Sequence, residues 1–182
     1  MKQILIIGTG GAGCNVIHDL QTARQENCSL PKSDFTFDKA TINSPDIHFC
    51  GVGYDTENSR QEPWFIPAGQ DLSTMLPDVL NGIETVFIVC GTHGKTGGSL
   101  AKEIEQYTAS KNIPTVLVAI YPFFFEGEGN TQQTIQYFES RSLDIIRLRN
   151  GDNVDMDLTV KEAFFYISLQ IFQAILSYLG EE

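Results

Sequence analysis

Two glycine-rich segments, Gly8–Gly13 and Gly91–Gly98, constrain the fold of this chain more than any other feature of its sequence. The first follows the apolar run Lys2–Ile7 and the second follows Thr85–Val89, and each precedes a segment with helical spacing. An apolar run that ends in glycines predicts a buried strand followed by a tight turn. The chain therefore shows the pattern of strand, glycine turn and helix twice.

Strands and helices alternate along the rest of the chain. Further strands are predicted at 47–52, 64–66, 116–120 and 144–148, and helices at 13–24, 76–80, 99–111, 131–141 and 158–179. Residues 25–46 are polar and include two prolines, so we interpret them as a long loop. This alternation predicts an α/β fold, a three-layer, doubly wound and mostly parallel sheet in one domain over residues 1–182. Ligands of such sheets bind beyond the carboxyl ends of the strands, where both glycine turns lie.

Composition limits the partners and the compartment. The 182 residues are 42% hydrophobic, which is enough for one buried core, and the net charge of -11 disfavours nucleic acid or an anionic membrane as a partner. The four cysteines are far apart and show no metal-ligand spacing, so we expect no metal site within the protein. We expect reduced thiols in a cytoplasmic protein.

The predicted last helix, 158–179, is long and largely apolar. Its uncharged stretch 163–179 reaches the short limit for a membrane span. Tyr166, Gln170, Gln173 and Ser177 recur at helical spacing, however, and form one polar stripe. We therefore expect no membrane span and a helix that is buried on most of its circumference.

The first glycine turn, Gly8–Gly13, has the composition of a phosphate-binding loop. Glycines let the backbone approach a phosphate closely, and the N-terminus of the following helix adds partial positive charge. The same spacing also fits the dinucleotide fingerprint, with Asp55 as the acidic residue after the second strand. A turn that merely packs the helix against its strand is the third alternative.

The second glycine turn contains Gly94-Lys95-Thr96, which is similar to part of a P-loop. A complete P-loop would need a glycine at Val89, so we interpret the segment as a second anion-binding turn. Thr96 and Ser99 would supply hydroxyl donors, and Lys95 is either a phosphate cation or a solvated loop residue. Two such turns suit the polyphosphate of a mononucleotide better than a nicotinamide dinucleotide.

Taken together, these motifs resemble the tubulin/FtsZ family of GTPases. GTGGAGCN at 8–15 is similar to the family's first phosphate loop, and VFIVCGTHGKTGGS at 86–99 to its signature loop with the preceding strand. PFFFEG at 122–127 resembles the family's sugar loop, and its distance from the signature loop makes it the most specific of these matches. VGYD at 52–55 and IIRLRN at 145–150 are similar to two further family segments. The resemblance implies a Rossmann-like nucleotide-binding domain that binds GTP or GDP, with Mg²⁺ able to accompany GTP.

The resemblance also implies roles for individual residues. On the first loop, the phosphate and base side would be lined by Gly10, Gly11, Gly13 and Asn15. On the second loop, the β- and γ-phosphates would be held by Gly94, Thr96 and Gly97, with Lys95 as an added cation. Glu126 would meet the ribose, and Asn150 would bond to guanine. Glu162 would accept from the N1–H and N2 amine of guanine, and Leu158 stands at the stacking position.

Several departures from the family pattern bear on activity. His93 and Lys95 replace glycines, Asn130 replaces an arginine, and the family's γ-phosphate loop is not recognisable. The family chain continues past the long helix into a catalytic acidic loop and a second domain, whereas this sequence ends at Glu182. We therefore expect no catalytic residue, weak or no GTP hydrolysis by this chain alone, and no family-type filament.

In the relatives the long helix is packed between two domains. Here its apolar face would be exposed, so we expect a homo-oligomer or a protein partner that binds through this helix. From the resemblance to the tubulin/FtsZ family we also expect a role in the cytoskeleton or in cell division. Two alternatives stay open: an interaction module of the same fold that no longer binds nucleotide, and an NAD-dependent Rossmann oxidoreductase, which would leave PFFFEG unexplained.

Overall fold

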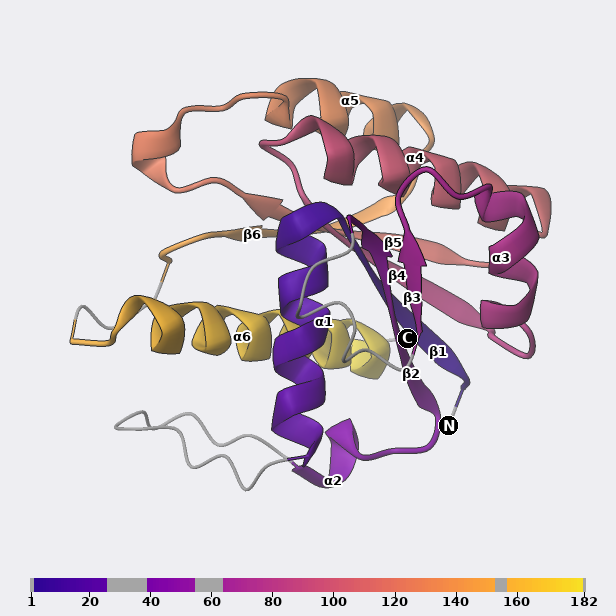
Figure 1. Ribbon diagram of the computed structural model, residues 1–182, viewed down its shortest axis with the longest axis horizontal. Helices are drawn as coiled ribbons and strands as arrows, with labels where there is room; N and C mark the ends of the chain where they lie inside the picture. The colour runs from indigo at the N-terminus through magenta and orange to yellow at the C-terminus, as the bar shows by residue number, and fades with distance from the viewer. Residues whose placement is uncertain (1, 26–38, 55–63, 153–156, 182) are drawn as a thin grey trace.

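The computed structural model describes residues 2–25, 39–54, 64–152 and 157–181 (Figure 1). Its centre is one six-stranded sheet in the order β3-β2-β1-β4-β5-β6, and every neighbouring pair of strands is parallel. The strands are β1 Ile4–Thr9, β2 Ile47–Gly53, β3 Phe65–Pro67, β4 Thr85–Gly91, β5 Thr115–Tyr121 and β6 Asp144–Arg149. The predicted α/β class and doubly wound parallel sheet are confirmed.

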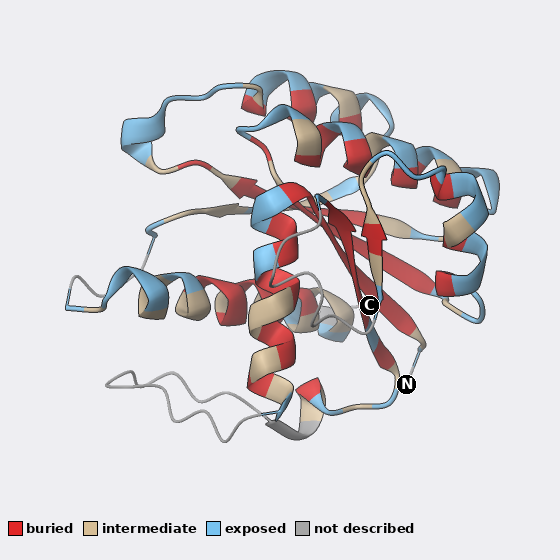
Figure 2. Ribbon diagram, viewed as in Figure 1, coloured by how far each residue is buried: buried red, intermediate tan, exposed pale blue. Residues whose placement is uncertain are grey.

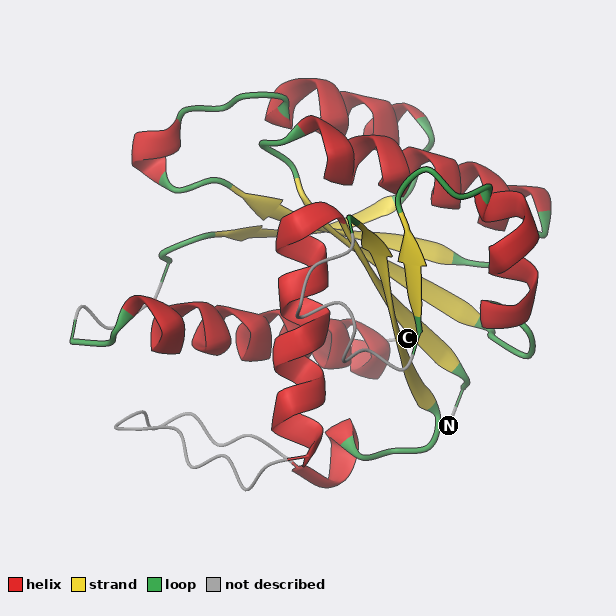
Figure 3. Ribbon diagram, viewed as in Figure 1, coloured by secondary structure: helices red, strands yellow, loops and turns green. Residues whose placement is uncertain are grey.

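The helices are α1 Gly10–Gln25, α2 Lys39–Ile42, α3 Leu72–Val79, α4 Lys95–Ser110, α5 Thr131–Ser140 and α6 Val160–Glu181, with a short 3₁₀ helix, η2, at Phe124–Glu126. They cover both faces of the sheet and make three layers (Figure 3). One layer contains α1 and α6, and the opposite layer contains α3, α4 and α5.

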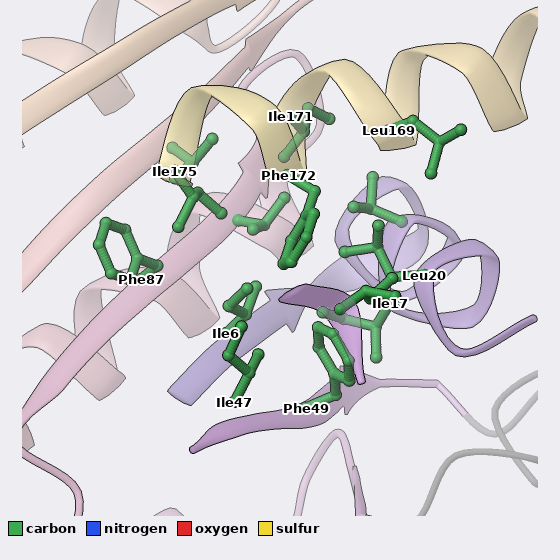
Figure 4. Close-up of a cluster of buried hydrophobic side chains, with 14 of the residues drawn as sticks. Ile6, Ile17, Leu20, Ile47, Phe49, Phe87, Leu169, Ile171, Phe172 and Ile175 are labelled. Atoms are coloured by element: carbon green, nitrogen blue, oxygen red, sulfur yellow. The ribbon is translucent and has the colours of Figure 1, made fainter. Parts of the chain in front are cut away.

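Alternation along the central strands explains why both faces are apolar. Ile4 and Ile6 of β1 face α1 and α6, whereas Leu5 and Ile7 face the other layer, and all four are at most 2% exposed. Burial is nearly continuous through the central strands β1, β4 and β5 and along the inner sides of the helices, whereas the edge strand β6 is partly exposed (Figure 2). Figure 4 shows Ile6, Phe49 and Phe87 of the sheet beneath α1 and α6.

Several helices differ from the sequence-based expectation, among them α1, which begins at Gly10 and not at residue 13. Helix α3 begins at Leu72, because the Asp71 carboxylate caps it by accepting from the Ser73 N–H at 2.9 Å. Helix α4 begins at Lys95, directly after the glycine turn, although its apolar spacing is visible only from Leu100 onward. The short helix α2 lies inside the segment predicted as a loop.

Helix α6 is long and apolar enough, by length and composition alone, to cross a membrane: Val160–Gly180 has a mean hydropathy of 1.4. In the structure its inner face belongs to the core, where Ile171, Phe172 and Ile175 are fully buried (Figure 4). The large apolar side chains that remain exposed on α6 are Val160 and Phe164, both in its first turns. The exposed apolar face is therefore smaller than the sequence suggests, and it lies at one end of the helix.

Candidate functional site

A groove runs along the carboxyl edge of the sheet, where the start of α1, the first half of α6 and the loop after β5 approach one another (Figure 1). It has two adjoining parts. The part that we call the loop cavity encloses about 290 Å³ between the two glycine turns, and the part that we call the helix cavity encloses about 660 Å³ between α1 and α6. Both parts are lined by Gly11, Ala12, Ile120, Glu126 and Asn150, so they form one continuous groove.

The two glycine turns touch each other beneath the loop cavity. Gly10 has a φ of 65°, and a Cβ at this position would lie 2.8 Å from the Cα of Gly97. A Cβ on Gly13 would collide with the carbonyl oxygen of Val89 on β4. These positions require glycine because the backbones of the two turns and of β4 approach more closely than a side chain permits.

The loop cavity has the character of an anion site. Helix α1 begins at Gly10 and helix α4 at Lys95, so the N-termini of two 16-residue helices meet at this cavity. Neither helix has an acidic residue in its first turn, and the N-cap of α4, Gly94, makes no side-chain cap. Among the described residues, no side chain caps the backbone N–H groups of these first turns, so they can donate to an anion, and Lys95 lines the same cavity.

The second glycine turn is tied to the loop after β5. Thr92 Oγ1 donates to the Ile120 carbonyl at 3.0 Å and lies 3.0 Å from Thr131 Oγ1. The backbone N–H and the side-chain amide of Asn130 both donate to the His93 carbonyl, each at 3.0 Å. Asn130, which departs from the family pattern, thus holds the two loops in a fixed relation.

The loop after β5 forms one wall of the groove. Glu126 Oε2 accepts from the Phe123 N–H at 2.8 Å, and this bond fixes the carboxylate at the junction of the two cavities. The Phe123 ring stacks on Phe125 with centroids 5.2 Å apart and meets Phe164 of α6 edge-on at 6.0 Å. Aromatic surface therefore lines this wall of the helix cavity, since Phe123 and Phe164 both face it.

The helix cavity carries polar side chains from two facing helices. Asn15, His18 and Asp19 come from α1, and Lys161 and Ser168 come from α6. Ser168 Oγ donates to Asp19 Oδ2 at 2.7 Å where the two helices cross. Burial raises the pKa of the Asp19 carboxyl, and the Ser168 hydrogen bond and the positive charges of His18 and Lys161 offset only part of this shift.

The structure brings most of the predicted site residues together. Those that line the groove are Gly11, Asn15, Gly94, Lys95, Thr96, Gly97, Glu126 and Asn150. Gly10 and Gly13 lie beneath it, where they permit the close backbone contacts described above. Asp55 lies outside the described residues.

Glu162 and Leu158 are not among the residues that line the groove. The Glu162 Oε2 atom accepts from the Thr159 N–H at 2.8 Å and from Thr159 Oγ1 at 2.6 Å, so it caps the start of α6. The additional side chains that line the helix cavity include six that are polar or aromatic: His18, Asp19, Phe123, Lys161, Phe164 and Ser168. Helical spacing is the signal that places them: Asp19 follows Asn15 by one turn, and Lys161, Phe164 and Ser168 share one face of α6.

The described residues contain no cluster of three or more His, Cys, Asp or Glu side chains that could hold a metal ion. The thiols of Cys14, Cys50 and Cys90 are buried, and burial raises the pKa of Cys90 to about 12. The Cys90 thiol is therefore protonated and unreactive at neutral pH.

No family model matches the chain. Comparison with known proteins finds cell division protein FtsZ 1 of Pyrococcus furiosus, 27% identical over 134 residues, a match that covers 69% of this chain and 34% of that protein. Among solved structures, an FtsZ dimer of M. jannaschii has a TM-score of 0.68 at 18% identity and covers 96% of this chain and 53% of its own. A protofilament of TubZ from bacteriophage PhiKZ has a TM-score of 0.63 at 13% identity, and the match covers 100% of this chain and 58% of the TubZ chain. This chain thus spans about a third of the length of FtsZ 1 and somewhat more than half of the solved chains.

Proposed function

We propose that the groove of this chain, which is similar in sequence to FtsZ and shares the fold of solved FtsZ and TubZ chains, binds a guanine nucleotide, GTP or GDP. The observation that carries this proposal is the contact between the two glycine turns, which joins two helix N-termini at one cavity. A single polyphosphate can be held by both turns at once. The helix cavity, at about 660 Å³, lies within the range of small-molecule sites, and the loop cavity, at about 290 Å³, adjoins it at the lower end of that range.

The polarity of the groove favours one orientation of the nucleotide. The phosphates lie in the loop cavity, where they accept from backbone N–H groups and from Lys95 and Thr96. Glu126, at the junction, accepts from the ribose hydroxyls. The base lies in the helix cavity, where the side-chain amides of Asn15 and Asn150 face it and Phe123 and Phe164 offer stacking surface.

Mg²⁺ would accompany the triphosphate when GTP is bound. Glu126 is the one carboxylate among the described residues that line the loop cavity, so the phosphate oxygens themselves would supply most ligands of such an ion. The chain's own residues hold and orient the phosphates.

Hydrolysis by this chain alone is slow in our proposal. Among the described residues that line the loop cavity, Glu126 is the sole carboxylate, and Phe123 N–H occupies one of its oxygens. Water positioning is a main part of catalysis in phosphoryl transfer, so a site whose one carboxylate is engaged with the backbone should hydrolyse GTP slowly.

A cytoplasmic role connected with the cytoskeleton or with cell division follows from the FtsZ relationship. Self-association, or association with a protein partner, is part of the same proposal, since one solved neighbour is a protofilament. Sedimentation velocity over a wide concentration range, with and without GTP, tests this. The proposal of association would be contradicted if the protein stays monomeric under all conditions and no protein partner is recovered with it.

Calorimetric titration with GTP, GDP, ATP and NADH tests the proposed ligand. We expect GTP and GDP to bind, ATP to bind more weakly, and NADH not to bind. Binding of NADH without guanine nucleotides would identify a dinucleotide site instead, and the absence of binding by all four ligands would favour an interaction module. Single-turnover incubation with GTP measures hydrolysis in the same preparation, and turnover faster than a few per minute would contradict slow hydrolysis.

A further inference from the structure

Asp19 is the carboxylate that faces the helix cavity from the middle of α1, one turn after Asn15. Its Oδ2 atom accepts from Ser168 Oγ at 2.7 Å, whereas Oδ1 accepts no hydrogen bond from any residue that the structure describes. Lys161 is a nearby cation, and it forms no ion pair with Asp19 within 4.0 Å among the described residues. Asp19 is half-buried at the cavity wall, and Oδ1 is not shut off from the cavity, so this oxygen can accept from a ligand while Ser168 holds the other.

The position of Asp19 within the groove determines which part of a nucleotide it meets. The loop cavity holds the anion-binding turns, and the shared lining residues Glu126 and Asn150 mark the junction. Asp19, Lys161 and Ser168 line the helix cavity alone, on the side away from both glycine turns. A nucleotide whose phosphates occupy the loop cavity therefore presents the edge of its base to Asp19.

We propose that Asp19 reads the base by accepting from the N1–H and the N2 amine of guanine, so that α1 rather than α6 supplies the acceptor that separates guanine from adenine. This inference rests on the proposed nucleotide site and names its specificity-determining residue. Adenine has no adjacent pair of donors on this edge, so it would leave the Asp19 carboxylate unpaired. Lys161 adds a donor to the same cavity, of the kind that the O6 atom of guanine accepts.

Glu162 is the competing candidate, and its contacts argue against it. It lies on α6 outside the groove lining, and its Oε2 atom already accepts two bonds from Thr159. To reach a base, Glu162 would have to leave the capping box at the start of α6. Asp19 needs no such rearrangement, because Ser168 already holds it at the cavity wall.

The test compares wild-type protein, Asp19→Asn and Glu162→Gln by calorimetric titration with GTP, ITP, XTP and ATP. ITP lacks the N2 amine, and XTP carries a carbonyl in its place. We expect wild-type protein to prefer GTP over ITP and ATP. In Asp19→Asn the affinity for GTP should fall by roughly 10- to 100-fold, while the affinity for ATP stays within a factor of about two.

The same variant should gain affinity for XTP, because an asparagine amide offers one acceptor for N1–H and one donor for the O2 carbonyl of xanthine. A gain of function cannot come from misfolding, and thermal unfolding of each variant gives an independent control. Glu162→Gln should keep the wild-type order of ligands.

Three outcomes would decide against the inference. If Asp19→Asn keeps the wild-type GTP-to-ITP ratio, Asp19 does not read the base. If Glu162→Gln loses that ratio, the acceptor lies on α6 as the sequence resemblance implied. If wild-type protein binds none of the four nucleotides, the proposed function itself fails, which is a result distinct from the first two.

Discussion

The loop cavity is built mainly from backbone, whereas the helix cavity is built from side chains. Gly11, Gly94 and Gly97 expose main-chain groups to the first, and Asn15, Asp19 and Phe164 define the second. The backbone framework beneath the loop cavity tolerates little change at Gly10, Gly13 and Gly97, because a Cβ at each would meet the backbone of a neighbouring strand or turn. In a site that is built from side chains, a given functional group can come from a different helix while the fold stays the same.

The largest effect is expected on the free energy of unfolding, from Gly13→Ala. This variant tests whether close backbone contacts constrain the loop cavity. Its Cβ would overlap the Val89 carbonyl oxygen, so the free energy of unfolding should fall by about 2–3 kcal/mol. Gly11→Ala is the matched control: a Cβ there meets nothing within 4 Å, and stability should change by less than about 1 kcal/mol. Gly11 faces the groove, however, so its substitution should still weaken nucleotide binding. Urea unfolding and titration of both variants test this, and equal stability losses would break the distinction.

An intermediate effect is expected from Phe164→Ala in the helix cavity. Phe164 is 46% exposed and contacts Phe123 edge-on, so its removal should cost little stability. Lost stacking should lower the affinity for GTP and ATP alike, by roughly 10-fold, because an aromatic face does not distinguish bases. Val160→Ala, on the same helix at a 73% exposed position, is the control and should leave affinity unchanged. An effect on GTP alone would mean that Phe164 takes part in reading the base edge.

A smaller effect is expected from Lys95→Ala in the loop cavity. Lys95 is exposed and adds charge to a site that the backbone already forms, so GTP affinity should fall about 3- to 10-fold and guanosine affinity should not change. The loss should shrink at high salt, because exposed charges are screened. Lys102→Ala provides the comparison, since that side chain lies over the Tyr137 ring, outside the groove. A loss of binding as large as that in Asp19→Asn would show that the backbone alone does not form the phosphate site.

The smallest effect concerns the pH dependence of stability. Burial raises the pKa of the Asp19 carboxyl above its ordinary value of 3.8. Between 3.8 and the raised pKa, the folded state therefore binds a proton more readily than the unfolded state does. Asp19 therefore destabilises the fold above the raised pKa, and the cost disappears as the pH falls through it toward 3.8. Asp19→Asn should be more stable than wild-type protein at pH 7, by up to about 1 kcal/mol, with a smaller difference in acid. Equal stability of the two proteins across the whole pH range would contradict the raised pKa.

Much of this could be predicted from the sequence, for a physical reason that the loop cavity makes clear. Glycines at Gly10, Gly13 and Gly97 are required by the fold, so they mark the turns and the strands before them in the sequence itself. The apolar runs of β1 and β4 fix the parallel sheet in the same way. The α/β class, the layers and the place of the groove followed from these features.

The helix cavity was harder to predict, because its residues depend on how α6 rotates and crosses α1. A shift of one residue along α6 moves a side chain by about 100° around the helix, which separates Glu162 from Lys161. Sequence similarity could place the helix, but only the packing of Ile171, Phe172 and Ile175 into the core determines which face meets the groove. The start of α3 was missed for a local reason, since the Asp71 cap stands apart from the apolar spacing.

The contact between Gly10 and Gly97 joins segments that are far apart in the sequence, and it exists only once β1 and β4 have paired. A ligand that spans both turns therefore binds the assembled sheet and no smaller unit of it. Saturation at 100 times the dissociation constant would stabilise the whole domain by about 2.7 kcal/mol. Amide exchange would consequently slow throughout the central strands, well away from the atoms that the nucleotide touches.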